Sequence, residues 1–159
     1  MAEELDLQQA QQTYETLCRA LDKNEWHYNR HDEHLAITAT ARGEDFPIEF
    51  SVEVDTKRKL ILLLSRLDLR VPEDKLVMMA VAVSVANNGM VFGGFDYNIQ
   101  EGRILFRLSN SYTGCELSED AFLQMIYTAC GTVDNYNDSF LMLCKGLITL
   151  EQFIQKENA

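Results

Sequence analysis

Three histidines lie within one short stretch and are the side chains best suited to bind a metal ion. His27, His31 and His34 stand beside two acidic residues. On a helix, the spacing of His27 and His31 would bring two imidazoles to one face, as in zinc sites, but the H-E-x-x-H pattern is absent. On a strand, His34 would point away from the other two. We therefore expect a solvated turn and no metal site.

The four cysteines are the other reactive side chains, and their spacing suggests no joint chemistry. Cys18, Cys115, Cys130 and Cys144 form neither a C-x-x-C pair nor a zinc-type pattern. One helix over residues 119–145 would hold Cys130 and Cys144 about 21 Å apart, which is beyond the reach of a disulfide. We therefore expect reduced thiols, which suit the cytoplasm.

Other motifs that bind ions or activate nucleophiles are incomplete. The segment 96–100 resembles the start of a calcium loop, but Glu101 stands where glycine is needed and Arg107 stands where glutamate is needed. The nearby glycines are not followed by a helix N-terminus that could receive a phosphate. A G-x-S-x-G motif is also absent. The sequence predicts no catalytic residue, no metal and no cofactor.

The overall charge argues against several classes of partner. The formal net charge is -11 and the pI is about 4.6, so the chain repels phosphate backbones and anionic lipid surfaces. The acidic start of the chain does not resemble a secretory signal, and no apolar run approaches the ~18 residues of a membrane span. We expect a cytoplasmic protein that binds neither nucleic acid nor membrane.

Hydrophobic periodicity predicts the elements of the first half. A helix over 6–23 is indicated by an apolar stripe at alternating spacings of three and four, formed by Leu7, Ala10, Tyr14, Leu17 and Leu21. A short strand around Trp26 and Tyr28 precedes an alternating strand over 35–41. The clearest alternation, over 46–54, leads through the turn 55–58 into the apolar run Leu60–Leu64. An antiparallel meander is the simplest topology for these strands.

The second half predicts two helices around a hairpin. A helix is expected between Pro72 and Gly89, and a long helix between Ser118 as N-cap and Gly146. A last short helix contains Phe153. The fold class is therefore α+β, an antiparallel sheet of about five strands with helices on one face, in the order α-β-β-β-α-β-β-α.

The hairpin between the two helices has a predicted register. Burial of the apolar side chains places Phe95 opposite Phe106 and Tyr97 opposite Ile104. This register puts Asp96 on the same face as Arg103 and Arg107. Cross-strand ion pairing is the simplest role for the two arginines.

The segment 85–107 resembles the YbjN-like bacterial sensory transduction regulators. A helix ending in asparagine leads to a strand with a glycine and an aromatic-acid pair, and a glycine turn leads to an R-I-x-F-R-like strand. Val133-Asp-Asn-Tyr136 and Gly146 match the C-terminal helix of that family, although Gln100-Glu101 replaces its acidic pair in the turn. The resemblance implies a single domain over 1–159 with a type III secretion chaperone-like fold, and no catalytic residues.

Together these observations favour a non-enzymatic protein-binding or regulatory module. We expect the sheet or a helix face to hold another protein, or a second copy of the chain as a homodimer. Our candidates for the partner-binding surface are Phe95, Tyr97, Arg103 and Arg107. The alternative is a ligand-sensing regulatory domain with a small molecule between the sheet and the long helix. A small enzyme whose site matches no motif is the third possibility.

Overall fold

One antiparallel sheet and four helices make up the computed structural model, which describes all residues from Met1 to Ala159. The elements are α1 (Ala2–Lys23), β1 (Tyr28–His31), β2 (Ala36–Arg42), β3 (Pro47–Asp55), β4 (Leu60–Arg66), α2 (Leu76–Asn88), β5 (Gly94–Asn98), β6 (Arg103–Ser111), α3 (Glu119–Lys145) and α4 (Leu150–Glu157). The predicted α+β class is confirmed. The sheet has six strands, because the short β1 pairs with β2.

The strand order is β1-β2-β3-β4-β6-β5, and every neighbouring pair is antiparallel. The first four strands form the expected meander. The continuation differs, because β6 and not β5 lies beside β4. The nine-residue β6 has partners on both sides, whereas the five-residue β5 is left at the edge. A short strand at the edge leaves few unpaired backbone groups, which limits aggregation.

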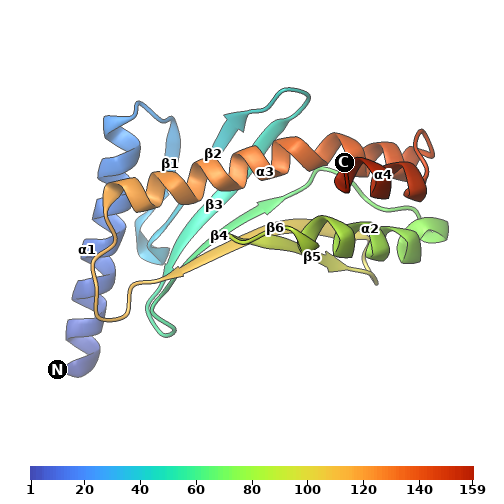
Figure 1. Cartoon of the computed structure of the whole chain (residues 1–159). Helices are drawn as coiled ribbons and strands as arrows, with labels where there is room; N and C mark the ends of the chain where they lie inside the picture. The colour runs from blue at the N-terminus through green and yellow to red at the C-terminus, as the bar shows by residue number, and fades with distance from the viewer.

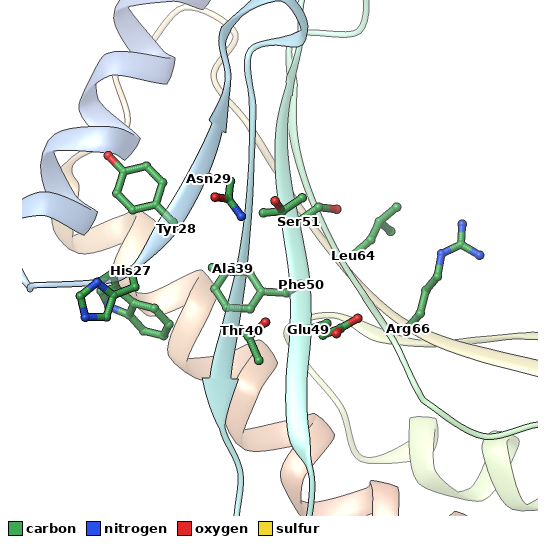
Figure 2. Close-up of a pocket in the computed structure, with 12 residues that line it drawn as sticks. His27, Tyr28, Asn29, Ala39, Thr40, Glu49, Phe50, Ser51, Leu64 and Arg66 are labelled. Carbon is green, nitrogen blue, oxygen red and sulfur yellow. The ribbon is translucent and has the colours of Figure 1, made fainter.

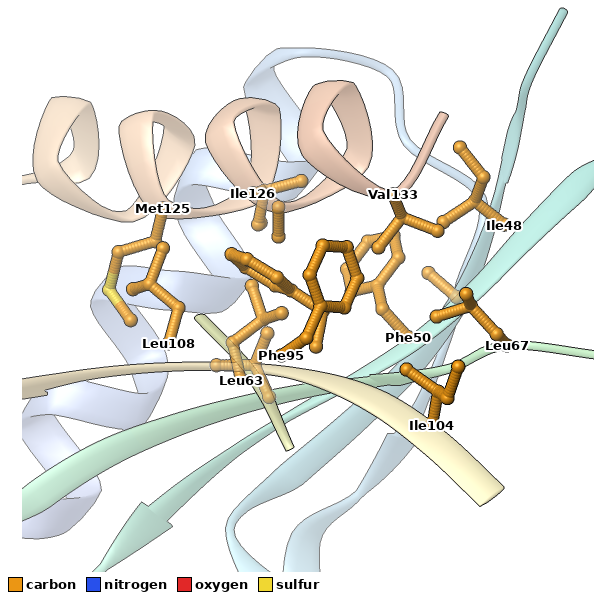
Figure 3. Close-up of a cluster of buried hydrophobic side chains, with 14 of the residues drawn as sticks. Ile48, Phe50, Leu63, Leu67, Phe95, Ile104, Leu108, Met125, Ile126 and Val133 are labelled. Carbon is orange, nitrogen blue, oxygen red and sulfur yellow. The ribbon is translucent and has the colours of Figure 1, made fainter. Parts of the chain in front are cut away.

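The core lies between the sheet and α3 (Figure 3). Phe50, Leu63 and Leu108 on the strands are buried against Met125 and Ile126 of the helix. Helix α1 packs against α3 and β3, while α2 packs on β5 and α4. Figure 1 shows α2 and α4 at the end of the molecule away from α1. The helices leave the opposite face of the sheet without a covering layer, as expected from the sequence.

The edge of the sheet at β5 is closed by a side chain. The carboxamide of Asn87, in the last turn of α2, donates to the carbonyl of Phe95 and accepts from its N–H, both at 2.8 Å. These two backbone groups point away from β6, since Phe95 and Phe106 oppose each other as a pair that exchanges no hydrogen bonds. The side chain therefore takes the place of a neighbouring strand at this position and ties α2 to the sheet.

The helix ends use the expected caps, with some additions. Ser118 accepts from the N–H of Ala121, and Gly146 ends α3 in the left-handed conformation. Lys75, just before α2, donates to the last carbonyls of α3 at Leu143 and Cys144, where a cation also complements the helix dipole. None of the helices combines the length and apolar character that a membrane crossing requires.

One residue of the apolar stripe predicted for the first helix is exposed. Leu7 is 48% exposed, because the first turns of α1 extend beyond the sheet. The apolar Val91 is also fully exposed, because β5 begins only at Gly94 and Val91 lies in the preceding loop.

Replacing Asn87 by alanine removes both hydrogen bonds to Phe95 and leaves two backbone groups without a partner. We expect this variant to lose about 1–3 kcal/mol of unfolding free energy, measured by urea denaturation. The matched control is Asn88→Ala at the exposed neighbouring position, where we expect a change within about 0.5 kcal/mol. Equal effects of the two substitutions would contradict the role of Asn87 at the sheet edge.

Candidate functional site

The open face of the sheet carries leucines at its centre. Strand β4 begins with Leu60-Ile-Leu-Leu-Leu64, so both of its faces are apolar. Ile61 and Leu63 are fully buried on the helix side, whereas Leu62 and Leu64 lie half-buried on the open side. Leu105 of β6 is also half-buried there, paired with Arg66. These three residues, Leu62, Leu64 and Leu105, are called the leucine stripe below.

One side of the leucine stripe borders a hollow of about 870 Å³ that crosses β1 to β4. Figure 2 shows the side chains that line it, with His27 at the start of β1 and Arg66 at the end of β4. Alternation along β2 and β3 turns mostly neutral polar side chains toward the hollow and buries Ala39 and Phe50 on the helix side, so Leu64 is the apolar strand side chain that faces the hollow. The lining residues are Trp26, His27, Tyr28, Asn29, Thr38, Ala39, Thr40, Glu49, Phe50, Ser51, Leu64 and Arg66.

Trp26 borders this hollow, but its ring packs on the helix side of the sheet. Its ring lies 5.7 Å from that of Phe50 in an edge-on arrangement and 6.3 Å from that of the exposed Tyr127. It is the only tryptophan of the chain, and it is half-buried.

A second hollow, of about 900 Å³, lies at the end of the β5–β6 hairpin. Leu105 and Arg103 line it, and Arg66 lines both hollows. Beside it, Arg107 pairs with Asp96 at 2.9 Å across the strands, which confirms the register. The open face thus combines an apolar centre with charges of both signs along its borders.

The four predicted binding residues lie on opposite faces of the sheet. Phe95 is only 3% exposed and packs edge-on against Phe106 and Phe140, so it has no surface to offer a partner. Tyr97 is half-buried on the same side and donates from its hydroxyl to the carbonyl of Leu76. Arg103 and Arg107 are exposed on the open side. Only the two arginines therefore remain candidates for direct contact with a partner.

The three histidines do not converge. His31 hydrogen-bonds to Thr38 at 3.0 Å on the neighbouring strand. The His34 imidazole lies 3.8 Å from Glu33 at the surface, and His27 faces the hollow. No group of three or more His, Cys, Asp and Glu side chains in the chain has the geometry to hold a metal ion.

A buried tyrosine ties α1 to the first two strands. The Tyr14 hydroxyl donates to Asp32 at 2.9 Å and lies 3.2 Å from the carbonyl of Ala36. Arg30 donates to Asp32 and to Glu15, and its guanidinium lies 5.1 Å above the Tyr14 ring. Burial, with the bond to Asp32, raises the pKa of Tyr14. The bond from Arg30, followed by that from Tyr14, lowers the pKa of Asp32, so this network stabilises the fold.

The thiols of the interior are not activated. Burial raises the pKa of Cys18 and of Cys144, and burial together with Asp134 raises that of Cys130 to about 11. A nucleophilic cysteine requires a lowered pKa. All four cysteines are free, and Cys115 lies exposed in the loop before α3.

The space between the sheet and α3 is small. The cavity beside Ile48, Leu67 and Val133 has a volume of about 40 Å³. Ligand pockets typically hold about 300–1,000 Å³. This cavity is therefore too small for the small molecule that the predicted alternative places between the sheet and the long helix.

The antiparallel sheet with helices on one face and an open opposite face has the type III secretion chaperone-like α+β fold. The chain belongs to the YbjN family, whose model, described as "Putative bacterial sensory transduction regulator", matches residues 13–142. The predicted family and fold are confirmed. No curated protein matches the sequence.

Three solved structures share this fold at low sequence identity. The crystal structure of YbjN from E. coli matches with a TM-score of 0.57 and 12% identity over 77% of this chain and 87% of that chain. The HopA1-SchA chaperone-effector complex gives 0.54 and 15% over 80% and 95%. The ExsC-ExsE complex gives 0.51 and 10% over 80% and 92%. The structural matches establish the fold. At such low sequence identities they do not transfer a function.

Sequence reasoning missed the leucine stripe and Arg66. The apolar run Leu60–Leu64 predicts a strand, but a strand in an antiparallel sheet with one open face should alternate apolar and polar residues. Apolar side chains at consecutive positions were the signal for a strand that is covered on both faces. Arg66 gave no signal, because its place between two hollows depends on the pairing of β4 with β6.

Substitutions at Phe95 and Arg107 should differ in their cost to the unfolding free energy, because Phe95 lies in the core and Arg107 at the surface. Phe95→Ala leaves a cavity between β5 and α3, and we expect it to cost about 3–5 kcal/mol of unfolding free energy. Arg107→Ala removes only an exposed ion pair, and we expect a cost of about 1 kcal/mol or less. Urea denaturation measures both values. Equal costs would contradict the placement of the two side chains on opposite faces.

Acidification should reveal the network at Asp32. Because Tyr14 and Arg30 lower the pKa of Asp32, its carboxylate stabilises the fold above the ordinary carboxyl pKa of about 4, and this contribution is lost as the pH falls through the lowered value. We therefore expect Asp32→Asn to lose less stability than the wild type between neutral pH and about pH 3, measured by urea midpoints. A steeper loss in the variant would contradict this role.

Proposed function

We propose that the chain is a non-enzymatic protein-binding regulatory module, and that the open face of its sheet holds an extended segment of a protein partner. The observation that carries this proposal is β4, which is apolar on both faces but covered by helices on only one. Apolar side chains on both faces are typical of strands that are buried on both faces. A partner supplies the missing cover.

The open face of the neighbouring strand β3 is polar, in contrast to the leucine stripe. Glu49, Ser51 and Glu53 of β3 alternate with buried residues, as a solvated face requires. The stripe interrupts this polar surface at the centre of the sheet, where Ser51 and Arg107 flank Leu64. A contiguous apolar patch rimmed by polar residues is the usual mark of an interaction site.

The shape and charge of the face favour a polypeptide. Both hollows are open to the surface and meet at Arg66, so an extended segment can follow them across several strands. Acidic and basic residues border the stripe, which suits the mixed side chains of a protein better than the uniform charge of nucleic acid or an anionic membrane. The net charge of -11 supports the same choice.

The structural relatives support a protein partner. Two of them were solved as complexes, of which one is described as a chaperone with its effector. We further propose that the module is one domain over residues 1–159, because Ala10 and Phe153, outside the matched family range, belong to the same core cluster. Free cysteines are consistent with a cytoplasmic protein.

We also propose that the protein functions as a homodimer. The open face would then be present twice in each assembly.

A photoreactive phenylalanine analogue at position 64 tests the open face. Leu64 lies in the stripe and is half-buried, so the fold should accept the replacement. We expect irradiation in bacterial cells that naturally make the protein to link it to a specific partner, identified by mass spectrometry. The matched control is the same analogue at Leu5, which is 62% exposed on α1, outside the sheet.

A defined variant then measures the contribution of the stripe. Leu64→Ser should weaken binding of the identified partner by at least about tenfold, because a leucine buried at an interface contributes on the order of 1.5–3 kcal/mol. Leu5→Ser should leave binding unchanged. Titration by isothermal calorimetry reports the affinity. Equal cross-linking at positions 5 and 64, or full binding by Leu64→Ser, would rule out the open face as the site.

A further inference from the structure

The charges next to Leu105 are mostly positive, in contrast to the charge of the whole chain. On the open face, Leu105 lies opposite Arg66 of β4 on one side and opposite Asp96 of β5 on the other. Its neighbours two residues away along β6 are Arg103 and Arg107, which therefore lie on the same face. Three arginines and a single carboxylate thus adjoin one leucine, in a chain whose net charge is -11.

Two of these arginines have no acidic partner in the chain. Asp96 pairs with Arg107, whereas neither Arg66 nor Arg103 forms an ion pair. Both are exposed, and Arg103 donates only to the carbonyl of Leu69, at 3.4 Å. A guanidinium presents five N–H donors in a planar fork that matches a carboxylate. Most of the donors of these two side chains are therefore available to a ligand.

The two unpaired arginines line one hollow, at the end of the β5–β6 hairpin. Because Arg66 opposes Leu105, it is the diagonal neighbour of Arg103 in the ladder. Positions of this kind are about 7–8 Å apart, a separation that two long side chains can bridge through one carboxylate. Arg66 and Arg103 thus form a basic pair at the mouth of the hollow.

An apolar pair lies directly beside the basic pair. Leu64 opposes Arg107 and is therefore the diagonal neighbour of Leu105. Leu64 precedes Arg66 by two residues on β4, and Leu105 follows Arg103 by two residues on β6. Two residues along a strand span about 6.6–6.8 Å. An extended polypeptide places its side chains i and i+2 on one side at the same spacing, so one segment can reach both pairs at once.

The surrounding charges favour a carboxylate of a protein over a phosphate backbone. Glu49 lines the first hollow, and Asp96 and Glu101 line the second. These carboxylates repel a ligand whose negative charge repeats along its whole length, as in nucleic acid. A polypeptide can present one acidic side chain to the arginines and an apolar side chain to the leucines.

We infer that Arg66 and Arg103 together bind one carboxylate of the partner, from an aspartate or glutamate two residues away from an apolar residue that lies on Leu64 and Leu105. Charge-assisted hydrogen bonds from a guanidinium add geometric specificity, so the acidic residue fixes the register of the segment while the leucines bury its apolar neighbour. This inference rests on the proposed function of the open face and adds the chemical signature of its partner.

Selection from a phage-displayed library of random peptides tests this signature. We expect the wild type to enrich peptides in which an apolar and an acidic residue are two positions apart, and Leu64→Ser to lose them. Arg66→Glu should enrich peptides with lysine or arginine in place of the acid. The matched control is Arg42→Glu, an equal change of charge at an exposed position of the same face on β2, which should enrich the same peptides as the wild type.

Calorimetric titration of the most enriched peptide, made synthetically, measures the size of the effect. Replacing its acidic residue by lysine should weaken binding to the wild type by at least about tenfold, because like charges then meet at the arginines. The same replacement should restore binding to Arg66→Glu. Arg103→Glu should behave as Arg66→Glu does, and circular dichroism establishes that each variant is folded.

The results that would overturn the inference differ from those that would overturn the proposed function. Peptides that require Leu64 but show no acidic preference, or that bind Arg66→Glu as tightly as the wild type, would refute this inference alone. A library that yields no peptide dependent on Leu64 would refute the open face as the binding site, and the inference with it. A single-stranded oligonucleotide that binds the wild type and not Arg66→Glu would refute the choice of a carboxylate.

Discussion

The pairing of β4 with β6 is the constraint on which the rest of the structure depends. It places two strongly apolar strands at the centre of the sheet and gives α3 a continuous surface of buried residues such as Leu63, Phe106 and Leu108. The same pairing brings Leu62, Leu64 and Leu105 together on the opposite face. Because side chains alternate along a strand, a strand that is apolar at consecutive positions contributes to the core on one side and leaves an apolar surface on the other.

The two ends of the molecule limit where partners can bind. At the β5 edge, Asn87 satisfies the backbone groups of Phe95, so this strand does not offer its full edge to another chain. At the other end, Tyr14, Arg30 and Asp32 fasten α1 to the first strands. Two exposed apolar surfaces remain, one at the centre of the sheet and one on α2. They differ in charge, because charged residues border the first and are absent from the second.

Sequence patterns predicted the elements more fully than the sites. The register of the β5–β6 hairpin followed from burying Phe95 and Phe106 together, and the ends of α3 followed from Ser118 and Gly146. Burial of Phe95 also removes it from any interface, which its aromatic character alone did not indicate. The leucine stripe required long-range information, since Leu64 and Leu105 meet only through the pairing of β4 with β6.

The central claim is that a protein partner covers the leucine stripe. The most direct measurement is hydroxyl-radical footprinting of the complex purified from bacterial cells that naturally make the protein, with oxidation of each leucine followed by mass spectrometry. We predict that Leu62, Leu64 and Leu105 oxidise more slowly in the complex than in the free protein, while Leu5 is unchanged. Unchanged oxidation of the stripe in a complex that holds its partner would contradict the account.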